Sequence, residues 1–232
     1  MGQHFLKSPK HISIICDAAD IRDRDVVVDL GAGRGALSKE ILKRGPKLLY
    51  VVEIDKYLCR KLKQELEHEN VVILCRDLLE VLPSDKFDKI VSSPPYYISS
   101  KLIERLVMSR FEKAVLVLQR EYVGKMLARP RTRKYGWLSV ISQACFQIDV
   151  VSFVPKECFD PPPRVDSLVI SLVQKRCASE RFVRLVRAAF LSRRKKLKNS
   201  ALAKIVGGTL FEERRAIELT PEDFIEILGE KS

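Results

Sequence analysis

Val26-Val-Val-Asp-Leu-Gly-Ala-Gly-Arg-Gly35 joins a short apolar run to a turn that contains three glycines. Residues 26–30 predict a strand, and residues 36–43, with apolar side chains at 37, 41 and 42, predict a helix. Glycines in such a turn let the backbone bend sharply and approach a ligand without a clash at Cβ. A strand, a glycine turn and a helix in this order predict an open α/β sheet that binds a ligand where its strands end.

The alternation of strands and helices continues along the chain. Further strands are predicted at 48–54, 71–75, 87–91 and 114–119, and further helices at 56–68, 98–108 and 121–128. Short apolar strands separated by helices are typical of a parallel sheet covered on both faces. Apolar runs at 145–153 and 167–173 are joined by a loop too short for a crossover helix, so they predict an antiparallel hairpin at the sheet edge. The expected fold is the Rossmann-like, seven-stranded sheet of class I methyltransferases.

From residue 176 the pattern becomes helical and basic. Helices are expected at 180–192, 199–206, 212–217 and 221–228, the last with Thr220 as N-cap before Pro221. A length of 232 residues suits one main domain with a modest appendage. We therefore predict a methyltransferase domain over 1–175 and a small helical domain over 176–232. Residues 1–174 and 175–232 each carry a net charge of +6, so a quarter of the chain holds half of the excess.

Composition limits the classes of function. Apolar residues make up 46% of the chain, which excludes general disorder, and the net charge of +12 favours a polyanionic partner, nucleic acid first. No apolar run approaches the ~18 residues that span a membrane, and residues 1–7 contain no signal-peptide core. The six cysteines form no CxxC pair, so we expect no metal site, no disulfide, and reduced thiols in a cytoplasmic protein.

The glycine turn alone does not identify the ligand. Gly31, Gly33 and Ala36 also satisfy the dinucleotide pattern, and a carboxylate at Glu53, where the second strand ends, suits the ribose of either cofactor. Asp77 follows the third strand, where it could bind an adenine amino group. With Asp29 expected near a methionine moiety, acids at three successive strands favour a cationic sulfonium ligand over a pyrophosphate.

Ser93-Pro-Pro-Tyr96 follows the fourth strand. Two prolines fix the backbone and remove two amide donors, so a carbonyl can accept a hydrogen bond. The tyrosine ring offers a stacking surface. These features suit a planar substrate with an amino group, whose lone pair is directed toward a methyl donor mainly by positioning.

With these motifs the chain strongly resembles the small-subunit ribosomal RNA adenine N6-dimethyltransferase family, in its archaeal form. The resemblance runs nearly end to end. Beyond the glycine turn and the two acids, it rests on the segments Gly2–Leu6, Ser92–Ser100, Leu118–Val123, Tyr135–Ser139, Val154–Ser167 and Ala189–Asn199. The last three are specific, and the glycine turn is not.

The resemblance implies the chemistry and the residues that perform it. Two adjacent adenosines near the 3′ end of small-subunit rRNA would each receive two methyl groups from S-adenosylmethionine, during assembly of the ribosome. The cofactor would contact His4, Leu6, Gly31, Gly33, Glu53, Asp77 and Ser93. The target adenine would lie between Tyr96 and Phe159, with Ser93 and Pro94 beside its amine. The partner would be a particle resembling the precursor of the small subunit, and we expect a monomer without metal or membrane attachment.

Ser93 departs from the family pattern, which usually has Asn at this place. Asn supplies a carbonyl acceptor for the target amine, whereas Ser supplies a shorter hydroxyl. Amino-methyltransferases in general have Asp, Asn or Ser here, so we expect activity to persist.

Two dense basic runs occupy residues 129–134 and 193–198, the second of them within the Ala189–Asn199 segment. Phosphate contacts from such runs supply affinity rather than sequence choice. We expect RNA binding by Arg129, Arg131, Arg133, Lys134, Arg193, Arg194, Lys195 and Lys196. Tyr135 and Trp137 could add base stacking, although Trp137 suits a core position better.

Other functions remain open from the sequence. The fold could serve a non-catalytic RNA-binding assembly or transcription factor, to which Ser93 gives some support. A large-subunit rRNA adenine methyltransferase shares most motifs, but the Ala189–Asn199 segment argues against it. A nicotinamide oxidoreductase leaves Ser93–Tyr96 without a role.

Overall fold

The computed structural model describes residues 4–84 and 86–229, which form two compact units. The first unit combines the chain up to residue 120 with residues 148–174. The second combines residues 121–147 with the chain from residue 175 onward. The second unit therefore contains 121–147 in addition to the C-terminal segment that the sequence separates, while the division into domains at residue 175 stays a prediction.

The first unit is built on a seven-stranded sheet with the order β4-β3-β2-β5-β6-β9-β7. β2 pairs in parallel with β3 and β5, β3 with β4, and β5 with β6, whereas β9 runs antiparallel to β6. The predicted seven-stranded sheet is thus confirmed. Its strands are β2 (Val26–Leu30), β3 (Leu48–Val52), β4 (Val71–Leu74), β5 (Lys89–Ser92), β6 (Lys113–Gln119), β7 (Phe146–Val154) and β9 (Ser167–Gln174).

The order of strands reverses between β2 and β5. From β2 the chain moves outward through β3 to β4, and from β5 it moves the other way to β6. Because crossovers between parallel strands are right-handed, the helices of the two halves cover opposite faces. The helices are α1 (Pro9–Ala19), α2 (Ala36–Lys43), α3 (Lys56–Glu65), α4 (Leu78–Val81) and α5 (Ser99–Val107), with the short 3₁₀ helices η1 (Tyr96–Ile98) and η2 (Lys156–Cys158).

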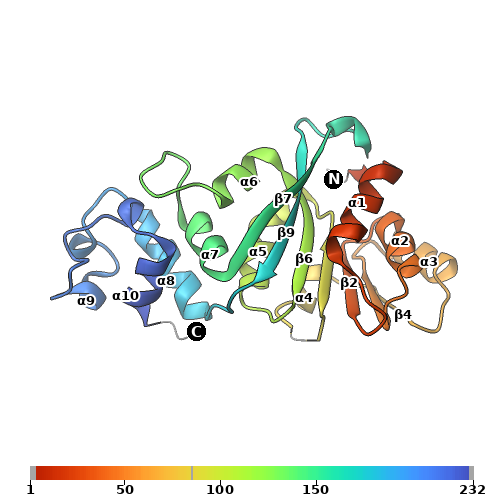
Figure 1. Ribbon diagram of the computed structural model, residues 1–232, viewed down its shortest axis with the longest axis horizontal. Helices are drawn as coiled ribbons and strands as arrows, with labels where there is room; N and C mark the ends of the chain where they lie inside the picture. Colours follow the sequence, from red (N-terminus) through yellow and green to blue (C-terminus); the bar gives the residue numbers. More distant parts are fainter. Residues whose placement is uncertain (1–3, 85, 230–232) are drawn as a thin grey trace. The chain divides into compact units, whose positions relative to one another are not determined.

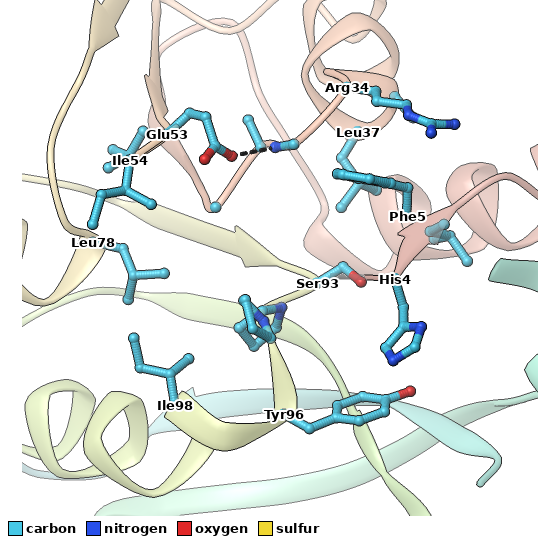
Figure 2. Close-up of a pocket in the computed structure, with 18 of the residues that line it drawn as sticks. His4, Phe5, Arg34, Leu37, Glu53, Ile54, Leu78, Ser93, Tyr96 and Ile98 are labelled. Atoms are coloured by element: carbon cyan, nitrogen blue, oxygen red, sulfur yellow. Dashed lines mark hydrogen bonds between the residues drawn. The ribbon is translucent and has the colours of Figure 1, made fainter. Parts of the chain in front are cut away.

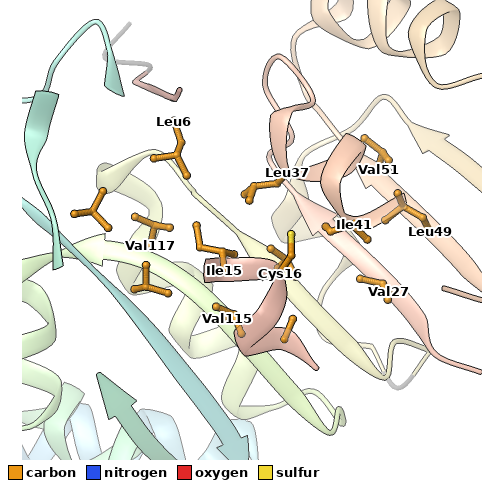
Figure 3. Close-up of a cluster of buried hydrophobic side chains, with 14 of the residues drawn as sticks. Leu6, Ile15, Cys16, Val27, Leu37, Ile41, Leu49, Val51, Val115 and Val117 are labelled. Atoms are coloured by element: carbon orange, nitrogen blue, oxygen red, sulfur yellow. The ribbon is translucent and has the colours of Figure 1, made fainter. Parts of the chain in front are cut away.

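The core of this unit lies where α1 and α2 cover the sheet. Figure 3 shows Ile15 and Cys16 of α1 and Ile41 of α2 among side chains of the strands. These three side chains are at most 1% exposed. The sequence analysis did not predict α1, although Ser8 before Pro9, at the first helical position, is a start signal for a helix.

A separate two-stranded sheet joins segments far apart in the sequence. β1 (Phe5–Leu6) pairs antiparallel with β8 (Phe159–Asp160), with Leu6 opposite Phe159. The backbone N–H of Lys7 continues the ladder by donating to the carbonyl of Cys158 at 2.8 Å. No local pattern in the sequence predicts this pairing.

The second unit is helical, apart from the first residues of β7. It contains α6 (Arg120–Met126), which begins in the first unit, α7 (Trp137–Cys145), α8 (Glu180–Leu191), α9 (Ala203–Val206) and α10 (Pro221–Leu228), with the 3₁₀ helices η3 (Leu197–Asn199) and η4 (Ala216–Glu218) (Figure 1). Thr220 caps α10 as predicted, accepting a hydrogen bond from the Asp223 backbone. The expected helix over 212–217 is wrong, since only the single turn of η4 forms there.

The helix α7 ends on a residue that the sequence analysis assigned to a strand. α7 extends to Cys145, so the predicted strand over 145–153 begins one residue later, as β7 at Phe146. α7 packs against α8 and α10 within the second unit. Residues 137–145 are nearly all buried there, serines included, so no polar face marks the helical period.

The expectation that all cysteines are reduced is wrong. Cys59 and Cys75 form a disulfide across a separation of 16 residues, with Cα atoms 5.8 Å apart. α3 packs against β4, which brings its Cys59 to the residue that follows the strand. Cysteine usage therefore does not indicate a reducing compartment. Separately, no helix among residues 4–84 and 86–229 has the length and apolar character to cross a membrane.

Candidate active site

The carboxyl ends of β2, β3, β4 and β5 meet at one edge of the sheet because these strands are parallel. A cavity of about 440 Å³ opens at this edge (Figure 2). Gly31, Glu53, Asp77 and Ser93, one from the end of each strand, all line it. This is the crevice in which open α/β sheets bind their ligands.

Glu53 holds the glycine turn against the sheet. Its Oε2 accepts a hydrogen bond from the backbone N–H of Gly33 at 2.7 Å, drawn as a dashed line in Figure 2, and its Oε1 accepts from Asp55 N at 2.8 Å. The side chain is 4% exposed. Gly33 has φ +57°, and a Cβ there would lie 2.8 Å from the Phe5 ring. Only glycine fits this position, so the loop approaches both Phe5 and the cavity closely.

Asp77 lines the cavity and also begins a helix. Its Oδ1 accepts a hydrogen bond from Leu79 N at 2.9 Å and so caps α4. This cap fixes the carboxylate and does not use Oδ2. Asp77 can therefore have a structural role and face a ligand at the same time.

Asp29 does not line the cavity, although the sequence placed it near the ligand. It is fully buried, and its Oδ2 accepts a hydrogen bond from the Ser38 hydroxyl of α2 at 2.6 Å. Burial raises the pKa of this carboxyl to about 7. The side chain points from β2 into the packing between strand and helix, because residues of a strand alternate between its two faces. Asp29 therefore fixes α2 behind the glycine turn.

The loop after β5 forms another wall of the cavity. Ser92 is buried and donates its hydroxyl to the carbonyl of Leu30 at 2.6 Å, which joins the ends of β5 and β2. Ser93 follows and faces the cavity, together with Pro94 and Tyr96 (Figure 2). The Tyr96 hydroxyl is hydrogen-bonded to the Ser167 hydroxyl, with 2.6 Å between Oη and Oγ. The loop thus brings Ser93, Pro94 and the aromatic ring of Tyr96 to one space.

The β1–β8 sheet closes the cavity from the side of the N-terminal segment. His4 donates from Nδ1 to the carbonyl of Pro161 at 2.7 Å, and its ring centroid lies 6.0 Å from that of Tyr96. Arg34 of the glycine turn lies 4.5 Å above the Phe5 ring and forms an ion pair with Asp160 at 2.8 Å. These contacts connect the glycine turn to the segment that carries Phe159.

Apart from Asp29, the structure brings the predicted cofactor and catalytic residues into this one cavity. They are His4, Leu6, Gly31, Gly33, Glu53, Asp77, Ser93, Pro94, Tyr96 and Phe159. Gly2 and Gln3 of the N-terminal motif lie outside the described residues. Phe159 is only 1% exposed, so its ring belongs to the core as well as to the cavity wall.

Sequence reasoning missed several lining residues. Phe5, Arg34, Arg76 and Lys101 also border the cavity. Phe5 and Arg34 lie within motifs that the sequence analysis had already identified. Their place in those motifs could therefore have predicted that they line the cavity. Lys101 has no such signal, because it reaches the cavity only through the position of α5.

The two basic runs meet within the second unit. Arg193 donates from one Nη to the backbone carbonyls of Arg133 and Tyr135, each at 3.4 Å. Lys196 forms an ion pair with Glu213 at 2.5 Å. Arg194 and Lys195 are exposed. Side chains of the second run therefore divide into some that hold this unit together and some that face solvent.

The expectation that Tyr135 stacks on a base is wrong. Tyr135 is fully buried, and its hydroxyl donates to the carbonyl of Leu219 at 2.7 Å. Burial raises the pKa of this phenol. Trp137 is half-buried and packs under the Arg187 guanidinium, 4.7 Å from the ring centroid. Tyr135 fixes the first basic run to the C-terminal helices rather than offering a surface to RNA.

Comparison with known proteins identifies the family of this chain. Residues 1–222 match the family model described as "Ribosomal RNA adenine dimethylase". The chain is 34% identical to "Ribosomal RNA small subunit methyltransferase A" of Sulfurihydrogenibium sp. (strain YO3AOP1), over 99% of this chain and 94% of that protein. It is 33% identical to the protein of the same name from Thermotoga maritima, over 98% of this chain and 82% of the relative.

Solved structures give the same result. A dimethyladenosine transferase from Plasmodium falciparum superimposes with a TM-score of 0.84 at 26% identity, covering 98% of this chain and 97% of that one. The 23S rRNA methyltransferase ErmE superimposes with a TM-score of 0.70 at 25% identity, covering 97% and 98%. Fold and cavity together define a class I methyltransferase.

More specifically, the chain belongs to the ribosomal RNA adenine dimethylase family. The predicted family and the prediction of a methyltransferase enzyme are therefore confirmed, and the reading as a nicotinamide oxidoreductase is excluded.

Proposed function

We propose that this protein transfers methyl groups from S-adenosylmethionine to N6 of two adjacent adenosines near the 3′ end of small-subunit rRNA, two to each base. The observation that carries the proposal is the single cavity that joins Glu53 and Asp77 to the Ser93–Tyr96 loop. The names of the relatives support small-subunit RNA as the substrate. We further propose that the protein acts as a monomer in the cytoplasm.

The residues of the cavity fit the cofactor. Glu53 keeps a buried carboxylate at the end of β3, fixed by two backbone amides and able to accept further hydrogen bonds from ribose hydroxyls. Asp77 keeps Oδ2 for the adenine amino group. Gly31 and Gly33 line the cavity with backbone alone, and His4 and Leu6 border the same space. When bound, S-adenosylmethionine supplies an activated methyl group on a sulfonium.

The Ser93–Tyr96 loop orients the target base. Ser93 Oγ and the carbonyl of Pro94 accept hydrogen bonds from the N6 amine and thereby turn its lone pair toward the methyl donor. Tyr96 stacks on the adenine ring, and Phe159 forms the opposite wall. Positioning of this kind accounts for the rate without a strong base, since held reactants gain large effective molarities.

Affinity for RNA comes from the second unit in this proposal. The basic side chains at Arg129, Arg131, Arg133, Lys134 and 193–196 lie there, and phosphate contacts dominate binding to nucleic acids. The exposed Arg194 and Lys195 are the strongest candidates from the second run.

The test is methyl transfer from tritiated S-adenosylmethionine to purified small subunits that lack the modification, followed by mapping of the labelled nucleotides. We expect label on two adjacent adenosines of the small-subunit RNA and none on large subunits. Label on the large subunit would instead identify a large-subunit enzyme. Binding to small subunits without transfer would identify a non-catalytic assembly factor.

A further inference from the structure

Asp166 and Ser167 end the proline-rich segment 161–167, yet the proposed reaction gives them no role. Ser167 is the first residue of β9, is fully buried and lies opposite Gln119 of β6. The carbonyl of Asp166 accepts a hydrogen bond from Arg120 N at 3.1 Å. Both residues are thus fixed to the central sheet by backbone pairing. Their side chains can therefore hold other groups at fixed positions relative to the sheet.

Ser167 contacts one wall of the proposed base pocket. Its Oγ lies 2.6 Å from Tyr96 Oη, although the two residues are 71 positions apart in the chain. Because the serine is buried on a strand, its hydroxyl has little freedom, and the short bond restricts the tilt of the tyrosine ring. Burial raises the pKa of the Tyr96 phenol, while the bond to Ser167 opposes that shift. The ring is held at both ends, by the loop and by the sheet.

Asp166 contacts the segment that carries the other wall. Its Oδ1 accepts a hydrogen bond from the backbone N–H of Lys156 at 3.1 Å. Lys156 is the first residue of η2, and η2 leads directly into Phe159 of β8. The carboxylate therefore anchors the turn from which Phe159 enters the cavity wall.

We propose that the Asp166–Ser167 pair is a positioning element that sets the placement of Tyr96 and Phe159 relative to each other. Asp166 and Ser167 are adjacent residues at the start of β9, and each fixes one wall. Both walls of the base pocket are therefore positioned relative to the central sheet. The inference rests on the proposed function. A misplacement of about 1 Å at such a site can cost 100-fold in rate, so the pair should act on kcat and leave cofactor binding unchanged.

The first experiment is a double-mutant cycle on the hydroxyl pair. Ser167→Ala and Tyr96→Phe should each lower kcat on unmethylated small subunits at least tenfold, and the double variant should fall no further than about twofold below either. The Kd for S-adenosylmethionine should not change. Ser171→Ala is the matched control, because Ser171 is also a buried serine on the same face of β9, four residues on. It should retain full activity.

The second experiment separates the acceptor role of Asp166 from its charge. Asp166→Ala should lower kcat at least tenfold, whereas Asp166→Asn, which keeps a carbonyl acceptor for Lys156 N, should recover most of it. A general structural role would not distinguish these variants at equal thermal stability. Equal losses of kcat in Asp166→Ala and Asp166→Asn would overturn the inference. So would a double variant of Ser167 and Tyr96 whose loss of kcat is the product of the two single losses.

The failure of the inference is distinguishable from that of the proposed function. If the unsubstituted protein transfers methyl groups and Ser167→Ala behaves as Ser171→Ala, only the inference fails. If the unsubstituted protein transfers none, the proposed function fails. Crystal structures of Ser167→Ala and Ser171→Ala without substrate then test the inference independently of activity. The Tyr96 ring must leave its position in Ser167→Ala and keep it in Ser171→Ala, and an unmoved ring in both would overturn it.

Discussion

The two units differ in charge far more than the sequence suggests. The first unit has 23 Lys and Arg against 21 Asp and Glu, a net charge of +2, and the second has 19 against 9, a net charge of +10. Divided at residue 175, the same chain gives +6 on each side. The difference arises because residues 121–147, with the first basic run, group with the C-terminal helices.

This contrast separates two physical tasks. The cavity of the first unit places carboxylates at strand ends, which suits a cationic cofactor, in an almost neutral body. The second unit concentrates the positive charge that a polyanion needs. Cofactor binding and RNA binding should therefore respond to substitutions in different units.

The largest effect is expected from Glu53→Ala in the first unit. The substitution leaves the amides of Gly33 and Asp55 without their acceptor and removes the ribose ligand. Hydrogen bonds to a charged group are worth roughly 1.5–3 kcal/mol each, so affinity for S-adenosylmethionine should fall about 1000-fold. Isothermal titration calorimetry measures this fall.

Two controls accompany Glu53→Ala. Glu67→Ala, at an exposed position after α3, should bind the cofactor as the unsubstituted protein does. Binding of small subunits should not change in either variant. Loss of subunit binding in Glu53→Ala alone would show that the two tasks are not divided between the units.

The next largest effect concerns the stability of the first unit. The Cys59–Cys75 disulfide closes a loop of 16 residues, for which chain entropy gives a stabilisation of about 3 kcal/mol. The double substitution Cys59→Ser and Cys75→Ser should lower the free energy of unfolding of this unit by that amount in denaturant titrations. A reductant should lower the unsubstituted protein to the same level and leave the variant unaffected. An unchanged midpoint in both would contradict a stabilising cross-link.

The fold was largely predictable because it depends on local periodicity. Strands from 26–30 to 114–119 and the helices between them follow from apolar spacing, and the glycine turn marks the strand end that matters. The site was predictable for a related reason. In a parallel sheet, residues that follow successive strands converge, so Gly31, Glu53, Asp77 and Ser93 share one edge.

The remainder depends on contacts that the sequence does not encode locally. Leu6 pairs with Phe159 across more than 150 residues, and Cys59 meets Cys75 only through the packing of α3 on β4. The basic run beside Tyr135 suggested a stacking residue, but its ring is buried and its hydroxyl donates to the carbonyl of Leu219, 84 residues away. Asp29 shows that an acid at the right strand can still face the wrong side.

A smaller effect is expected from the exposed part of the second basic run. Arg193 and Lys196 have structural contacts, so the pair Arg194→Gln and Lys195→Gln tests phosphate binding without disturbing them. Affinity for small subunits should fall about tenfold, and the slope of log K against log salt should decrease by about 1.4, or 0.7 per phosphate of single-stranded RNA. Filter binding at several salt concentrations measures both.

The control for this pair lies in the first unit. Lys56→Gln with Lys63→Gln removes the same charge from exposed positions of α3. Binding should change by less than twofold, and cofactor affinity should be unaffected in both pairs. Equal losses in the two pairs would mean that total charge matters and that the contrast between the units does not.

The smallest effect, and the finest test of the first unit, is Ser93→Asn. Asn extends an acceptor into the cavity from the position where the sequence resemblance predicts one, and Ser93 borders the cavity rather than the core. Methyl transfer to unmethylated small subunits should therefore stay within about twofold or rise, since one acceptor replaces another at the same amine. Ser92→Asn is the contrasting variant, because Ser92 is buried and joins β5 to Leu30, and it should lose activity through misfolding of the strand ends. A tenfold loss in Ser93→Asn, comparable to that of Ser92→Asn, would show that the acceptor for the target amine is a different group of the cavity.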